Sequence, residues 1–197
     1  MMNEEFIDKG YVKLPGFLDS GLLQFVTRSY HVNRHLLKPE KDNIVSVKTD
    51  GKGTDGMYIH PVSETLLVDG APIVSGILGE EVIPTYSYTR MYEKGDQLKI
   101  HRDRPACEVS LSLCIDYPSA LDVCTIDPNP LFFSETPNKD DGVGITLKRG
   151  DACLYSGMEL YHWRNPIEYE WHLQVFLHYV RKNGEYAEYA WDERSYE

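Results

Sequence analysis

The sequence predicts an α+β fold in which an antiparallel β-sandwich or barrel is covered on one outer face by N-terminal helices. Helical periodicity is confined to residues 1–80, whereas the chain from residue 82 onward consists of short runs rich in β-branched and aromatic residues, separated by turn residues. In addition, 197 residues without an internal repeat or a linker are enough for one domain with its own hydrophobic core.

The N-terminal part begins with a strand, a turn and a helix. Residues 11–14 form an apolar run between Gly10 and Pro15, which predicts a short strand. Asp19 or Ser20 can then cap a helix, because either side chain accepts hydrogen bonds from free backbone N–H groups. The apolar stretch LLQFV follows directly and supplies the buried side of that helix.

The next segment changes from polar to apolar. Residues 31–60 predict loops around one weak strand at residues 44–47. Residues 62–78 are apolar enough for a second helix, and we expect Gly70 and Pro72 to divide it, because proline cannot donate the helical hydrogen bond.

The C-terminal part contains six runs with the character of strands. They are VIPTYSYTRMY, QLKIHRD, EVSLSLCIDY, GITL, ACLYSG and WHLQVFLHYV. In the third run Val109, Leu111, Leu113 and Ile115 alternate with other residues, which predicts one face directed at the core. Residues 127–142, DPNPLFFSETPNKDDG, predict a polar surface loop or a lid.

Composition excludes some classes of partner and compartment. The formal net charge of -11 repels polyanions, so we expect neither nucleic acid nor an anionic membrane as a partner. The four cysteines form no CxxC pair, which indicates reduced thiols and a cytoplasmic protein. The start MMNEEFIDKG has no leader-like pattern, and no run of about 18 apolar residues suggests a membrane span.

An HxD pair carries the strongest chemical signal. His101 and Asp103 lie two residues apart on a predicted strand, so their side chains point to the same face. His162 follows a turn and a strand, ACLYSG, and can add a third ligand from a neighbouring strand. Two histidines and one carboxylate on one octahedral face are the ligand set of non-haem Fe(II) oxygenases. HRD also occurs in protein kinases, but the glycine-rich loop and the DFG motif of kinases are absent from the sequence.

The motifs taken in order resemble a known family. GYVKLPGFLDSGLL, TYSYTRMYEKGDQL, HRD, EVSLSLCID, LKRGDACLYSGMELYHWRNP and WHLQVFLHYV together resemble the prolyl-hydroxylase-like and phytanoyl-hydroxylase-like branch of the 2-oxoglutarate/Fe(II) oxygenases. The resemblance implies a double-stranded β-helix, or jelly roll, in which His101, Asp103 and His162 hold Fe(II) and Tyr92 points to 2-oxoglutarate.

The resemblance also implies an organisation and an activity. Residues 1–197 would form a single oxygenase domain, with residues 1–80 as mostly helical support and residues 82–182 as the jelly-roll core. Such an enzyme uses O2 and 2-oxoglutarate to hydroxylate a small molecule, an amino acid or a peptidyl residue, with release of succinate and CO2.

One departure from the family pattern concerns the 2-oxoglutarate C5 carboxylate. The family places an Arg or Lys about ten residues after the distal histidine, whereas position 172 here is histidine. Three explanations are open: Arg164 reaches in, His172 binds as a cation with Gln174 beside it, or the co-substrate is not 2-oxoglutarate.

Two other functional classes fit the same barrel. A cupin-like metalloenzyme would not use 2-oxoglutarate, and its cavity would need no cation for a carboxylate. A non-catalytic jelly-roll binding module would not need the metal, although the intact ligand set argues against it.

Overall fold

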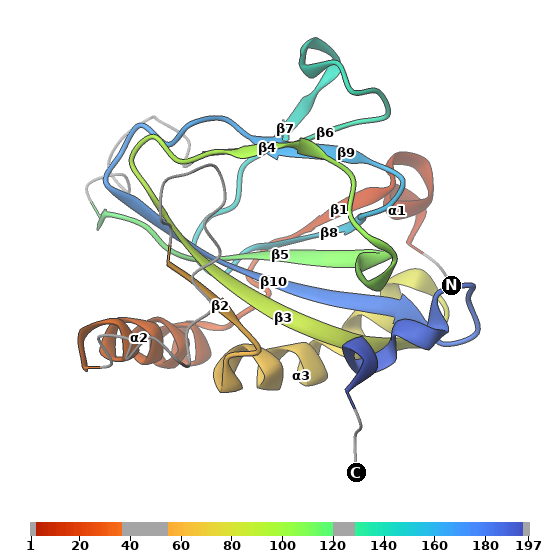
Figure 1. Cartoon of the computed structure of the whole chain (residues 1–197), viewed down its shortest axis with the longest axis horizontal. Coiled ribbons are helices and arrows are strands. Elements are labelled where there is room, and N and C mark those ends of the chain that lie inside the picture. The colour runs from red at the N-terminus through yellow and green to blue at the C-terminus, as the bar shows by residue number, and fades with distance from the viewer. Residues whose placement is uncertain (1–2, 37–54, 120–128, 195–197) are drawn as a thin grey trace.

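Two antiparallel sheets face each other in the structure, a computed structural model that describes residues 3–36, 55–119 and 129–194 (Figure 1). The larger sheet has six strands in the order β1 (Tyr11–Leu14), β8 (Ala152–Ser156), β5 (Val109–Asp116), β10 (Trp171–Arg181), β3 (Val82–Glu93) and β2 (Asp55–Tyr58). The smaller sheet has four in the order β4 (Leu98–His101), β9 (Tyr161–Arg164), β6 (Leu131–Ser134) and β7 (Val143–Ile145). The predicted combination of helices with antiparallel sheets is confirmed.

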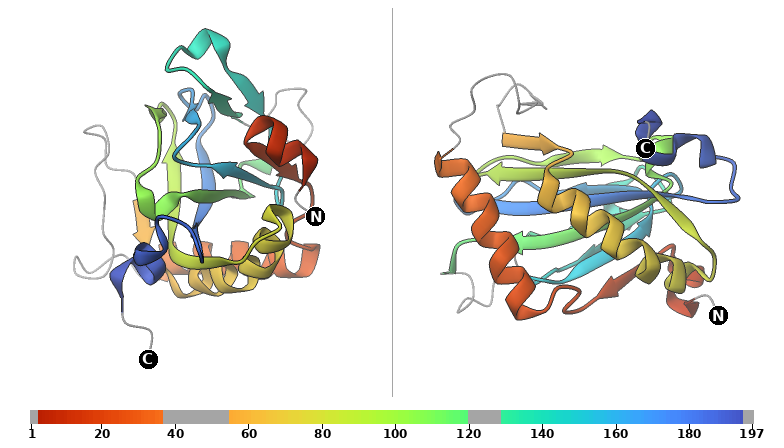
Figure 2. Two further views of the ribbon diagram at one scale, coloured as in Figure 1. Left: turned by 90° about the vertical axis from the view of Figure 1, so that its right-hand side faces the viewer. Right: turned by 90° about the horizontal axis from the view of Figure 1, so that it is seen from below.

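The helices lie on the N-terminal side of the sequence, as predicted. They are α1 (Glu4–Lys9), α2 (Ser20–Leu36) and α3 (Pro61–Leu78), and short 3-10 turns occur at η1 (Pro105–Cys107), η3 (Lys139–Asp141) and η4 (Ala187–Glu193). Seen from below, α2 and α3 lie across the outer face of the six-stranded sheet (Figure 2). Asp19 caps α2, because its Oδ1 accepts hydrogen bonds from the N–H groups of Gly21 and Leu22. Within the described residues, no helix has the length and apolar character needed to cross a membrane.

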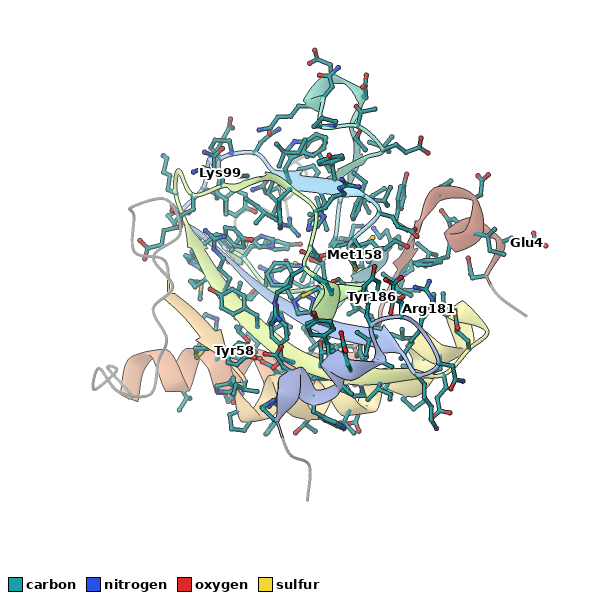
Figure 3. All side chains as sticks on the ribbon, turned by 45° about the vertical axis from the view of Figure 1, so that its right-hand side comes forward. Glu4, Tyr58, Lys99, Met158, Arg181 and Tyr186 are labelled. Carbon is teal, nitrogen blue, oxygen red and sulfur yellow. The ribbon has the colours of Figure 1, made fainter. Side chains whose placement is uncertain are left out.

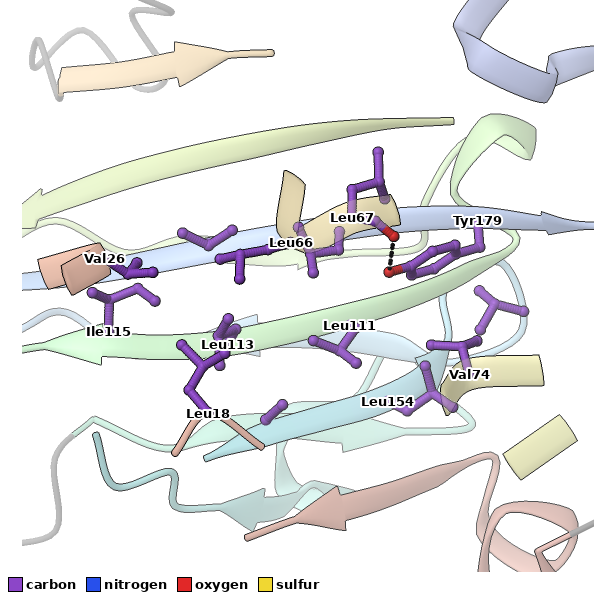
Figure 4. Packing of buried hydrophobic residues seen from close by; sticks show 14 of the residues in the cluster. Leu18, Val26, Leu66, Leu67, Val74, Leu111, Leu113, Ile115, Leu154 and Tyr179 are labelled. Carbon is purple, nitrogen blue, oxygen red and sulfur yellow. Dashed lines mark hydrogen bonds between the residues drawn. The ribbon is translucent and has the colours of Figure 1, made fainter. Parts of the chain in front are cut away.

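The two faces of the six-stranded sheet differ in character, because apolar and other side chains alternate along its central strands. Val109, Leu111, Leu113 and Ile115 of β5 are buried in the cluster under the helices, as the sequence predicts. On β10 the residues Leu173, Val175, Leu177 and Tyr179 join the same cluster. Figure 4 shows Tyr179 of β10 in contact with Leu67 of α3, near Leu111 of β5. The intervening residues of both strands are also buried, but they point toward the other sheet and include serine, histidine and glutamine. The strands therefore stabilise the fold with one face and present polar groups with the other.

The prediction that α3 is divided is wrong. The helix runs without a break from Pro61 to Leu78 and contains Pro72. Pro72 lies on the exposed side, where water can satisfy the carbonyl group that loses its hydrogen bond. Gly70 lies on the buried side, where it leaves room for the hydroxyl group of Tyr179.

The prediction of a loop over residues 127–142 is wrong in part. Leu131–Ser134 form β6, which lies between β9 and β7 in the smaller sheet. Phe132 stacks on Trp163 of β9, with ring centroids 5.4 Å apart, and Phe133 is buried. These cross-strand contacts override the turn-forming residues around the short apolar run. The weak strand expected at residues 44–47 lies outside the described residues.

Two glycines of α3 give opposite predictions for the same substitution. Ala in place of Gly76 meets no atom within 4 Å, so Gly76→Ala should stabilise the protein by about 0.5–1 kcal/mol through helix propensity. At Gly70 the added Cβ would lie 2.7 Å from the Tyr179 hydroxyl, which donates to the Leu67 carbonyl at 2.9 Å. Gly70→Ala should therefore destabilise by about 1–3 kcal/mol. Urea unfolding of both variants measures the change in the free energy of unfolding. Changes in the same direction for Gly70→Ala and Gly76→Ala would contradict the packing described.

Candidate active site

Neighbouring strands of the smaller sheet bring the predicted metal ligands together. His101 is the last residue of β4 and pairs in register with His162 on β9. Asp103 follows after one residue, and its N–H donates to the carbonyl group of Gly157 in the turn between β8 and β9. One nitrogen or oxygen from each of the three side chains lies within 4.8 Å of the others. The residues predicted from an HxD pair and a distant histidine therefore converge in space.

Backbone carbonyl groups set the tautomer of both histidines. His101 Nδ1 lies 2.8 Å from the Lys99 carbonyl oxygen, and His162 Nδ1 lies 3.1 Å from the Leu160 carbonyl oxygen. Because a carbonyl oxygen can only accept, each Nδ1 carries the proton and each Nε2 carries a lone pair. These Nε2 atoms lie 3.5 Å and 3.4 Å from the same carboxylate oxygen, Asp103 Oδ1. Such an outer hydrogen bond is the usual means of orienting a metal-binding imidazole.

Asp103 is held as a carboxylate. Burial opposes its ionisation, but the electrostatic effect of the facing His101 and His162 side chains outweighs burial and holds the pKa of Asp103 well below its usual range. Its second oxygen, Oδ2, accepts a hydrogen bond of 2.9 Å from the Ser110 hydroxyl, which also contacts His178 Nδ1 at 2.8 Å. Ser110 therefore fixes the carboxylate from behind and leaves Oδ1 directed at the histidines.

The donor set fits a divalent transition metal. Two neutral imidazole nitrogens and one carboxylate oxygen suit non-haem Fe(II), and the three ligands come from one side. A second group, Asp103, Cys107 and His178, also lies within ligand distance. It fits a metal less well, because the His178 Nδ1 already contacts Ser110 and burial raises the pKa of the Cys107 thiol, so that the sulfur stays protonated.

The ligands open onto a cavity of about 400 Å³ between the two sheets. Its aromatic walls come from β2, β3, β8 and β10, and one of the lining residues, Tyr58 of β2, is labelled in Figure 3. The lining residues other than the metal ligands are Tyr58, Tyr86, Tyr88, Arg90, Tyr92, Leu98, Tyr155, Phe176 and His178. Concave, mostly apolar walls with a few polar groups are typical of small-ligand sites.

Four buried polar atoms in the described part of the chain lack a hydrogen-bond partner, and all of them belong to residues of this interior. They are Arg90 Nε, Tyr92 Oη, Arg164 Nε and Arg164 Nη2. Arg164 is 1% exposed, and its Nη1 donates to the Asn129 carbonyl group. Each unsatisfied buried group costs about 1–3 kcal/mol, so such groups are expected where a ligand supplies the missing acceptor.

His172 and Gln174, by contrast, are fully engaged. His172 Nε2 donates to Gln174 Oε1 at 2.7 Å, while Nδ1 accepts from the Tyr169 hydroxyl at 2.8 Å. Gln174 Nε2 in turn donates to Ser112 Oγ at 2.7 Å. Burial, assisted by the charge of Arg164, lowers the pKa of His172 to about 3. The imidazole is therefore neutral and has no nitrogen left for a ligand.

Sequence reasoning assigned no role to several residues of the site. The parity of Tyr86, Tyr88, Arg90 and Tyr92 along β3 is visible in the sequence and places Arg90 on the cavity side. Ser110 has a comparable signal, because it alternates with the apolar residues of β5. Tyr169 has none: it lies in the connection between β9 and β10, three residues before His172, and no periodicity in that connection directs its side chain toward the imidazole.

Comparisons with known proteins bear on the fold. The sequence matches no protein-family model and no curated protein at a significant level. Among solved structures, a 2OG-Fe(II) oxygenase family oxidoreductase from Burkholderia pseudomallei gives a TM-score of 0.69 at 14% identity, over 93% of this chain and 95% of the other. A Pseudomonas putida prolyl-4-hydroxylase gives 0.65 at 15% identity, over 90% and 96%. EctD from S. alaskensis, with 2-oxoglutarate and 5-hydroxyectoine, gives 0.67 at 19%, over 89% and 73%.

The chain has the fold of the 2-oxoglutarate/Fe(II) oxygenases. The family resemblance inferred from the ordered motifs is thereby confirmed at the level of the fold. The oxygenase fold also accounts for the length of the chain, since the alignment with two of these structures covers nearly all of both partners.

Gly157 is predicted to be essential for the position of the Asp103 carboxylate. A Cβ at this position would overlap the Asp103 carboxylate and the Cys107 carbonyl group, neither of which can move without displacing a ligand or a turn. Gly157→Ala should therefore weaken Mn(II) binding by about tenfold or more, equivalent to about 1.4 kcal/mol. Calorimetric titration measures this, with Gly76→Ala as the control. Unchanged Mn(II) affinity in folded Gly157→Ala would contradict the close packing.

Proposed function

We propose that this protein is an Fe(II)- and 2-oxoglutarate-dependent oxygenase, with the metal held by His101, Asp103 and His162. One observation carries the proposal: two imidazole lone pairs and a carboxylate oxygen converge beside a cavity whose surroundings contain a buried, partly unpaired guanidinium. The comparison structures add support, because their names describe oxygenases and one holds 2-oxoglutarate. The proposal includes a double-stranded β-helix formed by the two sheets within one domain over residues 1–197.

Each residue of the site has a distinct task in this proposal. Bound iron would supply O2 activation coupled to the oxidative decarboxylation of 2-oxoglutarate to succinate and CO2. His101, Asp103 and His162 would hold the ion, and all three line the cavity in which a substrate can meet it. Tyr155 packs against His162 with ring centroids 4.8 Å apart, which keeps the imidazole in place and excludes water from behind it.

Arg164 is the residue best suited to bind the C5 carboxylate of 2-oxoglutarate. Its Nε and Nη2 atoms are buried and unpartnered, and two such N–H groups side by side match the two oxygens of a carboxylate. Tyr92 lines the cavity and has an unpartnered hydroxyl that can donate to the same group. His172 and Gln174 contribute by holding the neighbouring polar network in place, with His172 neutral.

The two alternatives receive less support from the site. In a cupin-like enzyme that does not use 2-oxoglutarate, the unpartnered Nε and Nη2 of Arg164 would have no carboxylate to bind. In a binding module that holds no metal, the fixed tautomers of both histidines and the ionised Asp103 would have no function. We place the activity in the cytoplasm, acting on a small-molecule or peptide substrate, in keeping with the three described cysteines, which are free and buried.

The direct test is release of succinate. Protein loaded with Fe(II) without O2 and then exposed to O2 and 2-oxoglutarate should release succinate, slowly without substrate and faster with one. Asp103→Ala should abolish both metal binding and succinate release, because it removes the only anionic ligand. Arg28→Ala on the exposed side of α2 is the control and should behave as wild type. Metal binding retained in folded Asp103→Ala would overturn the assignment.

The anchor of 2-oxoglutarate can be identified by its pH dependence. Arg164→Ala should weaken 2-oxoglutarate binding to the Mn(II) protein by about 2–5 kcal/mol, the usual cost of breaking a buried charge pair. Wild-type affinity should stay constant from pH 6 to pH 8, because Arg164 remains charged and His172, with a pKa of about 3, remains neutral.

The opposite outcome is equally clear. Protonation of His172 at pH 7 would cost on the order of 5 kcal/mol in the ligand-free protein. A histidine anchor would therefore show affinity that falls steadily as pH rises, and His172→Asn would lose binding. Either result would replace Arg164 by His172 as the anchor.

A further inference from the structure

Arg90 is a second buried guanidinium for which the oxygenase proposal has no use. It lies on β3, on the face that carries Tyr88 and Tyr92, and only 5% of its surface is exposed. Its Cζ atom lies 4.1 Å from the centre of the Tyr92 ring, so the guanidinium stacks on an aromatic face. Its Nε has no hydrogen-bond partner, and no carboxylate in the described part of the chain forms an ion pair with it.

An unpaired buried cation is costly, and stacking on Tyr92 offsets the cost only in part. A cation–π contact is weak compared with the free energy that is lost when a charge is removed from water. The nearby acidic groups are already engaged: Asp103, which lines the cavity, lies beside the two histidines, and Asp192, which contacts the lining residue Tyr58, pairs with Arg104 at 2.9 Å. The described residues thus supply no anion for Arg90, which indicates a ligand as the source.

The count of charges in the proposed complex distinguishes this ligand from 2-oxoglutarate. A divalent ion would be neutralised by Asp103 and by the metal-binding carboxylate of 2-oxoglutarate, and the charge of Arg164 would be neutralised by the C5 carboxylate. Arg90 is then the cation that remains. It also differs in place, because Arg90 lines the cavity whereas Arg164 lies outside that lining, beside the polar network of His172. The anion that meets Arg90 therefore belongs to another molecule in the cavity.

We propose that Arg90 binds the carboxylate of the substrate, and that the substrate is a small carboxylic acid with an aromatic or apolar body. This inference rests on the proposed oxygenase function. The cavity that Arg90 lines is also lined by the rings of Tyr88 and Phe176, whose centroids lie 6.4 Å apart, and by the rings of Tyr86 and Tyr58. A cavity of about 400 Å³ that also holds 2-oxoglutarate leaves room for a small molecule only.

The geometry gives the substrate an orientation. A carboxylate held by Arg90 places the attached body along the aromatic walls, with one end toward the open side of the metal ligands, since Arg90, His101 and Asp103 line the same cavity. Arg90 is a specificity-determining residue in this arrangement. It selects carboxylates over neutral analogues, because a neutral amide would leave the buried charge unpaired.

Matched pairs of acids and amides test the proposal. Protein loaded with Mn(II) and saturating 2-oxoglutarate is titrated with benzoate, phenylacetate and 4-hydroxyphenylacetate, and with the amide of each, by calorimetry. At least one acid should bind about tenfold or more tightly than its amide, as expected for a charge-assisted hydrogen bond. Arg90→Gln should remove this preference and leave the affinity for 2-oxoglutarate within about twofold of wild type. Arg28→Gln is the matched surface control.

The outcomes that overturn the proposal are separate from a failure of the oxygenase function. No preference for any acid over its amide in wild type overturns it, as does a preference that survives in Arg90→Gln. Loss of 2-oxoglutarate binding in Arg90→Gln assigns this residue to the co-substrate instead. Melting temperature gives the control for folding: that of Arg90→Gln should equal or exceed wild type, and a lower value indicates a structural role. Failure of wild type to bind 2-oxoglutarate rejects the oxygenase function, and the acid and amide pairs can still be compared with Mn(II) alone.

Discussion

Positive charge buried between the two sheets is the constraint on which the rest of the structure depends. Arg90 and Arg164 are each at most 5% exposed, and each keeps at least one nitrogen without a partner in the described residues. Buried, partly unpaired guanidinium groups reduce the stability of the ligand-free protein, so other parts of the structure must supply the stability of the fold. It comes from the layer between the helices and the six-stranded sheet, where the largest buried apolar cluster lies. This division of stability and function between two layers explains why a charged interior is tolerated.

The same strands serve both layers. On β10 the odd-numbered residues from Leu173 to Tyr179 pack under the helices, while His172, Gln174, Phe176 and His178 face the smaller sheet. A shift of one residue in register would bury the polar set under the helices and expose the apolar set to the cavity. Pairing of β10 with both β3 and β5 fixes the register from two sides. The position of the site is therefore secured by the packing of the core.

The positions of the three candidate metal ligands depend on backbone geometry more than on side-chain contacts. Carbonyl groups of Lys99 and Leu160 orient the two imidazoles, and the carbonyl of Gly157 holds the N–H of Asp103. Backbone groups of paired strands move little, so the ligand atoms are arranged before a metal binds. Ser110 adds a side-chain hydrogen bond to Asp103 Oδ2 and connects the carboxylate to His178 on β10. Through this link the smaller sheet, which carries the histidines, is tied to the larger sheet.

By itself the sequence determined the order of helices and strands, the two-sided character of β3 and β5, and the choice of His101, Asp103 and His162, because these depend on local periodicity and on residue type. Local patterns could not place β6, which forms through stacking of Phe132 on Trp163, or predict the unbroken α3, in which Pro72 is exposed. The tertiary structure shows which side chain has nitrogens left for an anion. Tyr169 and Gln174 hydrogen-bond to the two nitrogens of His172, whereas Arg164 donates to the Asn129 carbonyl group through Nη1 and keeps Nε and Nη2 unpartnered. Tyr169 and Gln174 lie within three residues of His172, but the sequence does not record how these side chains turn in the fold, and that orientation determines whether a buried polar group is paired.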